Sequence, residues 1–310
     1  MFENLLDNLK KKDVKTISKL ISFVENEKDG YLELLSKIYP LTGHSYRLGI
    51  TGPPGSGKSS LTNRLVEKFT NSNYSVAVIA IDPSSPFNGG SILGDRIRFS
   101  NNFDTSNTYF RSMSTRGSQG GLSKSSSFVA DIFDAAGYDI TIFETVGVGQ
   151  IEVDVIEAAD TVMVTLVPES GDDIQMMKSG LMEIADLYII NKSDRDGSDR
   201  LYNSLNKILE LNMSNKWNPL ISKTSATTGV GVDELFNNIN MHKAYLKKNN
   251  IQISKMDDRY LKSVQHFISE SLNNNFWNSN NHISDILNQE LKLNHSKRLS
   301  PYQIAQKLLD

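Results

Sequence analysis

Short apolar runs recur along the middle of the chain, and most of them are separated by segments long enough to form a helix. This alternation is typical of a parallel sheet whose crossover helices cover both faces. We therefore expect a three-layer α/β/α domain with a mostly parallel sheet over residues 44–245. The expected strands are YRLGIT, YSVAVIAID, TYFRSM, ITIFET, TVMVTLV, LYIIN and PLISKTSA.

The two ends of the chain carry helical periodicity instead. Residues 1–43 and 246–310 place apolar side chains at helical spacing, which predicts an N-terminal helical extension and a C-terminal helical segment. The Asn-rich stretch 273–282 predicts a loop between helices. Near the end, Ser300 is expected to cap a helix that begins at Pro301, with Gln303 closing a capping box.

Composition narrows the classes of function. A chain of 310 residues with a formal charge of -3 lacks the strongly basic face of a nucleic-acid binder. It has no cysteine, which excludes disulfides, thiolate metal sites and a cysteine nucleophile. No stretch reads as a signal peptide or a membrane span, so we expect a soluble, cytoplasmic protein.

The segment GITGPPGSGKSS contains a complete phosphate-binding loop, G-x-x-x-x-G-K-[ST], between an expected strand and an expected helix. Its glycines let backbone N–H groups wrap phosphates, and the following helix N-terminus adds partial positive charge. Lys58 is expected to reach the β- and γ-phosphates and the Ser59 hydroxyl to ligate Mg²⁺. The nucleotide-binding residues expected here are Gly52, Pro54, Gly55, Ser56, Gly57, Lys58, Ser59 and Ser60.

Two later segments point to guanine as the base. NKSD places Asn191, Lys192 and Asp194 after a strand, and a carboxylate at Asp194 can accept two hydrogen bonds from guanine but finds no such donor pair on adenine. In SKTSATTG, backbone around Ser225 and Ala226 is expected to donate to the guanine carbonyl.

The segment ETVGVGQ supplies a further carboxylate. P-loop enzymes need an acidic residue near Mg²⁺ on a strand beside the P-loop strand, so Glu144 is the candidate, with the Gly147 N–H near the γ-phosphate. Val148 stands where Ras-like proteins carry the glutamine that aligns the attacking water. Hydrolysis by the isolated chain is therefore expected to be slow.

Six ordered segments give the chain a family resemblance. They are GPPGSGKSS, AIDPSSPFNGGSILGDRIRF, STRGSQGGLS, ETVGVGQIEVD, VPESGDDIQMMKSGLMEIAD and NKSD. Together they resemble the MeaB/ArgK GTPases, P-loop proteins that act as chaperones of adenosylcobalamin-dependent acyl-CoA mutases such as methylmalonyl-CoA mutase.

The resemblance implies further roles. Asp82 and Asp95 match acidic residues of the first switch region and would join Ser59 and Glu144 around Mg²⁺. Lys178 lies in a segment that resembles an additional switch sensing the mutase and influencing hydrolysis, and it is counted with Lys58 and Glu144 as catalytic. A homodimer formed through the C-terminal helices is also implied.

Alternatives remain open at this stage. They are an ATP-dependent kinase of transport proteins, which NKSD opposes, a GTPase serving nickel enzymes, which the missing cysteines oppose, and a nucleotide-sensing scaffold without catalysis. None of the five histidines has Asp two residues before it, so no cobalamin site of the D-x-H-x-x-G type is expected in the chain itself.

Overall fold

The computed structural model describes residues 3–82, 107–114, 121–145, 158–168, 181–211, 217–279, 281–293, 299–300, 303–304 and 307–308. These residues fall into two compact units, Met1–Lys255 and Met256–Asp310. No helix in these ranges is both long enough and apolar enough to cross a membrane.

The first unit is built on a seven-stranded sheet in the order β3-β2-β4-β1-β5-β6-β7. Every strand pair is parallel, and the seven strands coincide with the apolar runs that predicted them. The strands are β1 Tyr46–Thr51, β2 Val76–Asp82, β3 Thr108–Ser114, β4 Ile140–Thr145, β5 Thr161–Leu166, β6 Leu187–Ile190 and β7 Leu220–Lys223.

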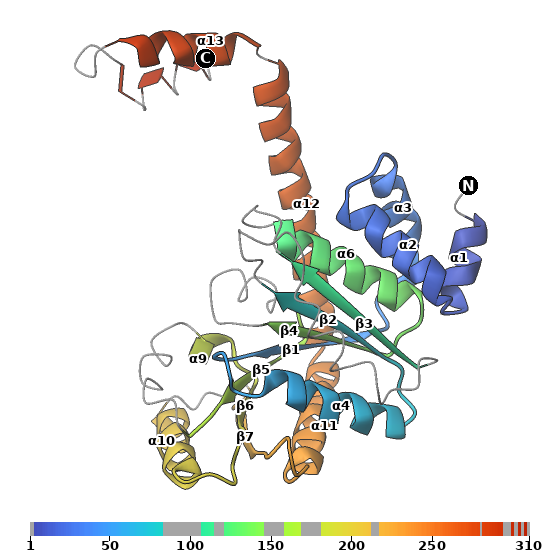
Figure 1. Cartoon of the computed structure of the whole chain (residues 1–310), viewed down its shortest axis with the longest axis vertical. Coiled ribbons are helices and arrows are strands. Elements are labelled where there is room, and N and C mark those ends of the chain that lie inside the picture. Colours follow the sequence, from blue (N-terminus) through green and yellow to red (C-terminus); the bar gives the residue numbers. More distant parts are fainter. Residues whose placement is uncertain are drawn as a thin grey trace. The chain divides into compact units, whose positions relative to one another are not determined.

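Helices cover both faces of this sheet, and Figure 1 shows α4 and α6 on opposite sides of it. Apolar residues of α4 (Lys58–Asn71) and α11 (Val232–Lys248) pack with alternate strand residues on one face. Residues of α10 (Ser198–Leu211) pack with the intervening residues of β5 and β6. Because both faces are buried, each central strand reads as a nearly continuous apolar run.

Three short helices precede the sheet, α1 Glu3–Lys10, α2 Val14–Glu25 and α3 Tyr31–Ile38, followed by the 3-10 turn Tyr39–Leu41. They lie beside α6 (Gly121–Ala135), where Lys124 pairs with Glu27 at 2.9 Å and the Tyr31 and Phe128 rings lie 6.3 Å apart. The predicted helical periodicity of this region is confirmed.

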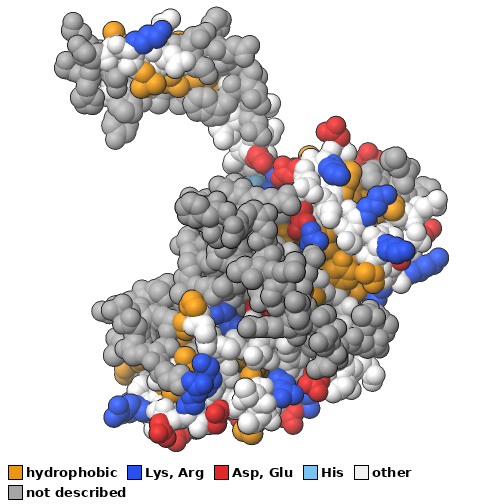
Figure 2. Space-filling view, in the orientation of Figure 1, with side chains coloured by type: hydrophobic (Ala, Val, Ile, Leu, Met, Phe, Trp, Pro, Cys, Tyr) orange, Lys and Arg blue, Asp and Glu red, His pale blue; other side chains and the backbone are white. Residues whose placement is uncertain are grey.

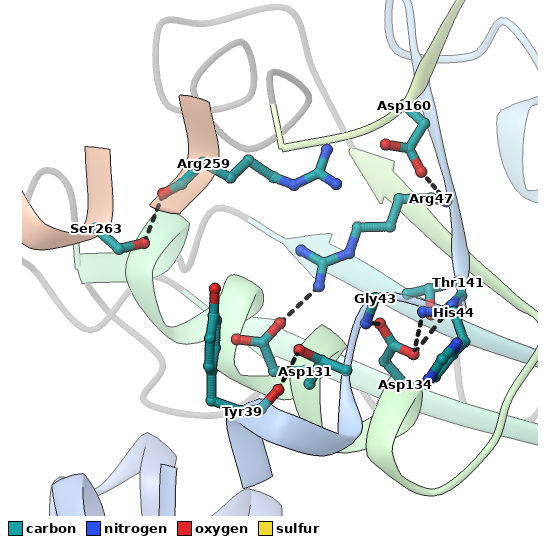
Figure 3. Close-up of polar contacts among 12 residues, drawn as sticks. Tyr39, Gly43, His44, Arg47, Asp131, Asp134, Thr141, Asp160, Arg259 and Ser263 are labelled. Atoms are coloured by element: carbon teal, nitrogen blue, oxygen red, sulfur yellow. Dashed lines mark hydrogen bonds and ion pairs between the residues drawn. The ribbon is translucent and has the colours of Figure 1, made fainter. Parts of the chain in front are cut away.

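A carboxylate on α6 holds the segment that joins these helices to β1 (Figure 3). Asp134, which is 3% exposed, accepts the backbone N–H groups of Gly43, His44 and Ser45 at 2.7, 3.1 and 3.0 Å. Nearby, the Arg47 guanidinium pairs with Asp131 at 2.6 Å. Burial lowers the pKa of Arg47, but Asp131 and its acidic neighbours more than offset this, so the net pKa is raised.

A buried polar network occupies the amino-terminal edge of the sheet. His242 of α11 is 1% exposed, its Nδ1 lies 2.7 Å from the Thr161 hydroxyl, and its Nε2 lies 3.4 Å from Asp186. The Trp217 ring lies 4.6 Å from the His242 ring. Burial, helped by the positive charge of Lys255, lowers the pKa of His242 to about 3, so the imidazole is neutral.

Lys255 completes that network at the beginning of α12 (Ile251–Ser279). Its ammonium donates to the Asp160 carbonyl at 2.6 Å and lies 3.7 Å from the Asp186 carboxylate. Burial raises the pKa of Asp186, an effect that Lys255 opposes. The ammonium thus ties the first turns of α12 to the starts of β5 and β6.

The second unit contains most of α12, then α13 (Asn281–Lys292). The boundary between the two helices falls within the predicted range 273–282, but the prediction of a loop over that whole stretch is wrong, since α12 continues to Ser279 and α13 begins at Asn281. Asparagine costs a helix well under about 1 kcal/mol relative to alanine, so an Asn-rich run without glycine or proline need not end it. The predicted capping box is confirmed, with Gln303 N–H donating to Ser300 Oγ at 3.3 Å and Ser300 N–H to Gln303 Oε1 at 3.0 Å.

Candidate functional site

The phosphate-binding loop spans residues 52–57, between the end of β1 and the start of α4. Gly52 has φ +146°, and a Cβ there would lie 2.2 Å from the Thr165 carbonyl oxygen. Gly57 has φ +84°, and a Cβ there would lie 2.4 Å from the Asn191 side-chain nitrogen. Both positions therefore require glycine, for conformation and for space.

Lys58 begins α4 and folds its side chain back over this loop. It is 6% exposed, and its ammonium donates to the Gly52 and Pro53 carbonyls at 2.6 and 2.8 Å. These bonds fix a positive charge within the loop, at the helix end whose N–H groups favour anions. The geometry suits a phosphate group.

Ser59 and Glu144 lie next to each other beside the loop, although they are 85 residues apart in the sequence. Glu144 lies in β4, is 5% exposed, and accepts a hydrogen bond from the Ser59 hydroxyl. A hydroxyl and a carboxylate beside a phosphate loop form the oxygen donor set that Mg²⁺ prefers. The residues fit a magnesium ion in this position.

Asp82 ends β2 at the same edge of the sheet. In the β2–β4 pairing Ala80 faces Glu144 and Ile81 faces Thr145, so the Asp82 backbone lies one residue further along. Gly147, Asp95 and Lys178 lie outside the described residues. Within the described ranges, no cluster of three or more His, Cys, Asp or Glu side chains forms a metal site.

Asn191 connects the phosphate loop to the segments expected to read the base. Its side-chain N–H donates to the Ser56 carbonyl at 2.8 Å, while its Oδ1 accepts from Ala226 N–H at 3.1 Å and Thr224 Oγ1 at 3.2 Å. It is 2% exposed. One buried amide thus joins three loops into a single frame.

Asp194 lies in the exposed part of this frame, and its carboxylate can accept hydrogen bonds. A hydrogen bond from the Ser225 side chain, with help from a backbone N–H, lowers the pKa of Asp194. The loops around it are joined by backbone bonds, from Ser193 N–H to Thr224 O at 2.9 Å and from Thr224 N–H to Ile190 O at 2.8 Å. An ionised carboxylate and the Ala226 backbone therefore share one corner of the site.

Sequence reasoning missed one residue of this corner. Arg64, on α4, donates from Nε to the Ala226 carbonyl at 2.9 Å and from Nη2 to the Thr227 carbonyl at 3.0 Å. The contact joins positions 162 residues apart along the chain, and no spacing rule marks it.

A parallel α/β sheet with a phosphate-binding loop after β1 and an N-K-x-D sequence after β6 is characteristic of a P-loop GTPase. A family model described as "Methylmalonyl Co-A mutase-associated GTPase MeaB" matches residues 17–281. The chain belongs to this family, and it is a GTPase.

Individual relatives agree with this assignment. A Pyrococcus horikoshii protein named as a GTPase is 42% identical over 312 residues, covering 99% of this chain and 97% of that protein. The GTPase ArgK of Escherichia coli is 39% identical over 213 residues, or 67% of this chain and 64% of that one. A solved structure described as "LAO/AO transport system kinase" superposes with a TM-score of 0.73 at 25% identity, covering 99% and 95% of the two chains.

Proposed function

We propose that this GTPase is a chaperone that gates cofactor loading and protection of an adenosylcobalamin-dependent acyl-CoA mutase of the methylmalonyl-CoA mutase type. The nucleotide part of the proposal is carried by the Asn191 frame, which joins the phosphate loop to the base-reading corner. The mutase part is supported by the family description, which names that enzyme. In this assignment residues 44–245 form the GTPase domain, between helical segments 1–43 and 246–310.

The nucleotide would span the frame, with its phosphates at the phosphate loop and its base at the Ala226 corner. Backbone N–H groups of 52–60 and the Lys58 ammonium would hold the phosphates, with the Gly147 N–H near the γ-phosphate. Asp194 would accept from the guanine ring N–H and amine, and Ala226 N–H would donate to the guanine carbonyl. Asn191 and Lys192 would support that corner, because Asn191 is bonded to the loops on both sides.

Magnesium would be held by oxygen ligands at the edge where Ser59 and Glu144 meet. The ion would neutralise charge developing on the phosphate oxygens during hydrolysis. Ser59 would bind it directly, and Glu144, Asp82 and Asp95 would surround it, directly or through water. The chain itself is not proposed to hold cobalamin.

The mutase would supply what the isolated chain lacks. With Val148 after Gly147, no glutamine orients the attacking water at that position. We expect isolated hydrolysis well below about 1 per second, as in unassisted GTPases. Contact with the mutase would act through the segment containing Lys178.

Single-turnover GTP hydrolysis, with and without the cognate mutase, tests this proposal. We expect the mutase to accelerate hydrolysis markedly; an arginine supplied by a partner is worth about 10³- to 10⁵-fold in related switches. Lys178→Ala is expected to remove the stimulation. A mutase that leaves the rate unchanged would refute the chaperone assignment while leaving the GTPase assignment intact.

A kinase acting with ATP is the second candidate, because the similar solved structure carries that description. The lowered pKa of Asp194 opposes it, since an ionised carboxylate facing adenine would have no donor pair to bind. A site that pairs the donors of one base rejects analogues lacking them by about 10⁴. Comparable affinities for ATP and GTP would favour the kinase.

We also propose that the second unit forms a homodimer. Hydrophobic side chains lie on the visible face of this unit (Figure 2). On α12 an exposed apolar stripe recurs about every four residues, at Tyr260, Leu261, Val264, Ile268 and Leu272. Analytical ultracentrifugation is expected to show a dimer that Ile268→Glu weakens and that Ser263→Glu, on another face of the helix, does not.

A further inference from the structure

Arg64 links the helix that begins at the phosphate loop to the loop expected to read the guanine carbonyl. It lies on α4 six residues after Lys58, about 9 Å along the helix axis. Its guanidinium donates to the Ala226 and Thr227 carbonyls at 2.9 and 3.0 Å. A third contact, to Glu67, is longer at 3.3 Å.

We propose that Arg64 is a positioning residue that sets specificity for the carbonyl oxygen of guanine, by holding the Ala226–Thr227 backbone against α4. This inference rests on the guanine site proposed above. Arg64 touches no reacting atom in it, because its bonds go to backbone carbonyls.

Peptide geometry shows which part of the loop the two carbonyl contacts fix, namely the two peptide planes that directly follow the Ala226 N–H, the proposed donor to guanine. In a trans peptide the C=O and the following N–H point in opposite directions. Fixing the Ala226 carbonyl on Arg64 therefore turns the Thr227 N–H away from the guanidinium. The Thr227 carbonyl fixes the next peptide plane in the same way.

The Ala226 N–H is already engaged on its other side by Asn191 Oδ1 at 3.1 Å. A guanine carbonyl would accept from the same N–H, either together with Asn191 Oδ1 or in its place. The loop must therefore keep its position while the acceptor of the Ala226 N–H changes. Charge-assisted bonds from a planar fork resist such a shift better than neutral bonds do. Arg64 thus holds the loop from the carbonyl side while Asn191 holds it from the amide side.

The ordinary role of a half-exposed arginine is a small contribution to stability. The Arg64 side chain is 37% exposed, so its replacement is tolerable for the fold. A purely structural role would alter affinity for all guanine-like nucleotides by the same factor. A role at the carbonyl would alter only those that present a strong acceptor there.

Three nucleotides separate these roles, by competition against a fluorescent GDP on the full chain with Mg²⁺. They are GDP, 6-thio-GDP, in which a weakly accepting sulfur replaces the carbonyl oxygen, and IDP, which lacks the amine facing Asp194. Arg64→Met keeps the aliphatic stem and removes both carbonyl bonds. Glu67→Gln is the matched control, because it removes the negative charge of the longer contact and keeps those two bonds.

We expect the wild type to prefer GDP over 6-thio-GDP by about tenfold, the value of one hydrogen bond to a well-placed donor. Arg64→Met is expected to reduce that ratio to about twofold and to leave the GDP to IDP ratio unchanged. Arg64→Lys, which retains one donor, is expected to lie between the two, and it replaces Arg64→Met if that variant fails to fold.

Three results would overturn the inference. They are an unchanged GDP to 6-thio-GDP ratio in the Arg64 variants, a parallel fall of both ratios, or a Glu67→Gln variant that behaves like Arg64→Met. A wild type that fails to distinguish GDP from ADP would overturn the proposed guanine site as well, so the two failures are distinguishable.

Discussion

Acidification is expected to destabilise the protein through His242. The imidazole is 1% exposed, contacts the Thr161 hydroxyl and the Trp217 ring, and lies near Asp186, with Lys255 close by. Its pKa in the folded chain is about 3, against about 6.5 in an unfolded one. Because the folded state resists protonation, this contribution to stability is present above pH 6.5 and is lost as the pH falls.

The magnitude at pH 5 depends little on the folded value. The unfolded chain gains the proton over about 1.5 pH units, and the folded chain gains almost none as long as its pKa stays well below 5. At about 1.36 kcal/mol per unit, the free energy of unfolding falls by about 2 kcal/mol between pH 7.5 and 5. The other titrating groups, Asp186 included, add their own pH dependence.

A His242→Gln variant isolates the effect, because glutamine stays neutral while the other groups remain. Urea unfolding is followed by tryptophan fluorescence in a Trp277→Phe background, which leaves Trp217 beside residue 242 as the reporter. The wild type is expected to lose about 2 kcal/mol more than the variant between the two pH values. A difference between the two proteins that is the same at pH 7.5 and pH 5 would refute the reasoning.

Three further predictions concern the nucleotide site. Gly57→Ala is expected to weaken GDP binding about tenfold or more, because its Cβ would lie 2.4 Å from the Asn191 amide. The control Gly55→Ala, at φ +76° with nothing within 4 Å, carries only backbone strain, and equal losses of affinity in calorimetric titration would contradict this. Lys58→Ala is expected to abolish productive GTP binding, and a variant that still binds and hydrolyses GTP would exclude its phosphate role. Glu144→Gln is expected to spare GDP binding and slow single-turnover hydrolysis about tenfold or more; a wild-type rate would exclude its role beside Mg²⁺.

Periodicity and local motifs predicted the sheet well because they depend on neighbours in sequence. All seven apolar runs became strands, and the loop at 52–57 has the glycine conformations its pattern requires. The meeting of Ser59 with Glu144 was also anticipated, since a P-loop and a neighbouring strand end at the same sheet edge. The roles of all the site residues stay predictions, and Asp95, Gly147 and Lys178 lie outside the described residues.

Contacts between distant segments were not predictable in the same way. Arg64 occupies an unremarkable helical position, and only the folded chain brings it to the carbonyls of 226 and 227. His242 has the spacing of an ordinary core residue on α11, and its partners Thr161 and Asp186 lie at the starts of β5 and β6. The loop expected over 273–282 was overestimated for another reason. Its prediction rested on composition alone, and an Asn-rich composition does not by itself end a helix, since α12 runs to Ser279.

The hydrogen bonds that Asp134 accepts from Gly43, His44 and Ser45 have a consequence for protein engineering. A fragment beginning at residue 46 would lose the three N–H groups that the Asp134 carboxylate accepts, and with them the contact that fixes the start of β1 against α6. Helices α1–α3 therefore cannot be exchanged between GTPases like a detachable tag. A chimera would need to carry the 43–45 segment and the carboxylate of α6 together, so the transferable module includes part of a helix that covers the sheet.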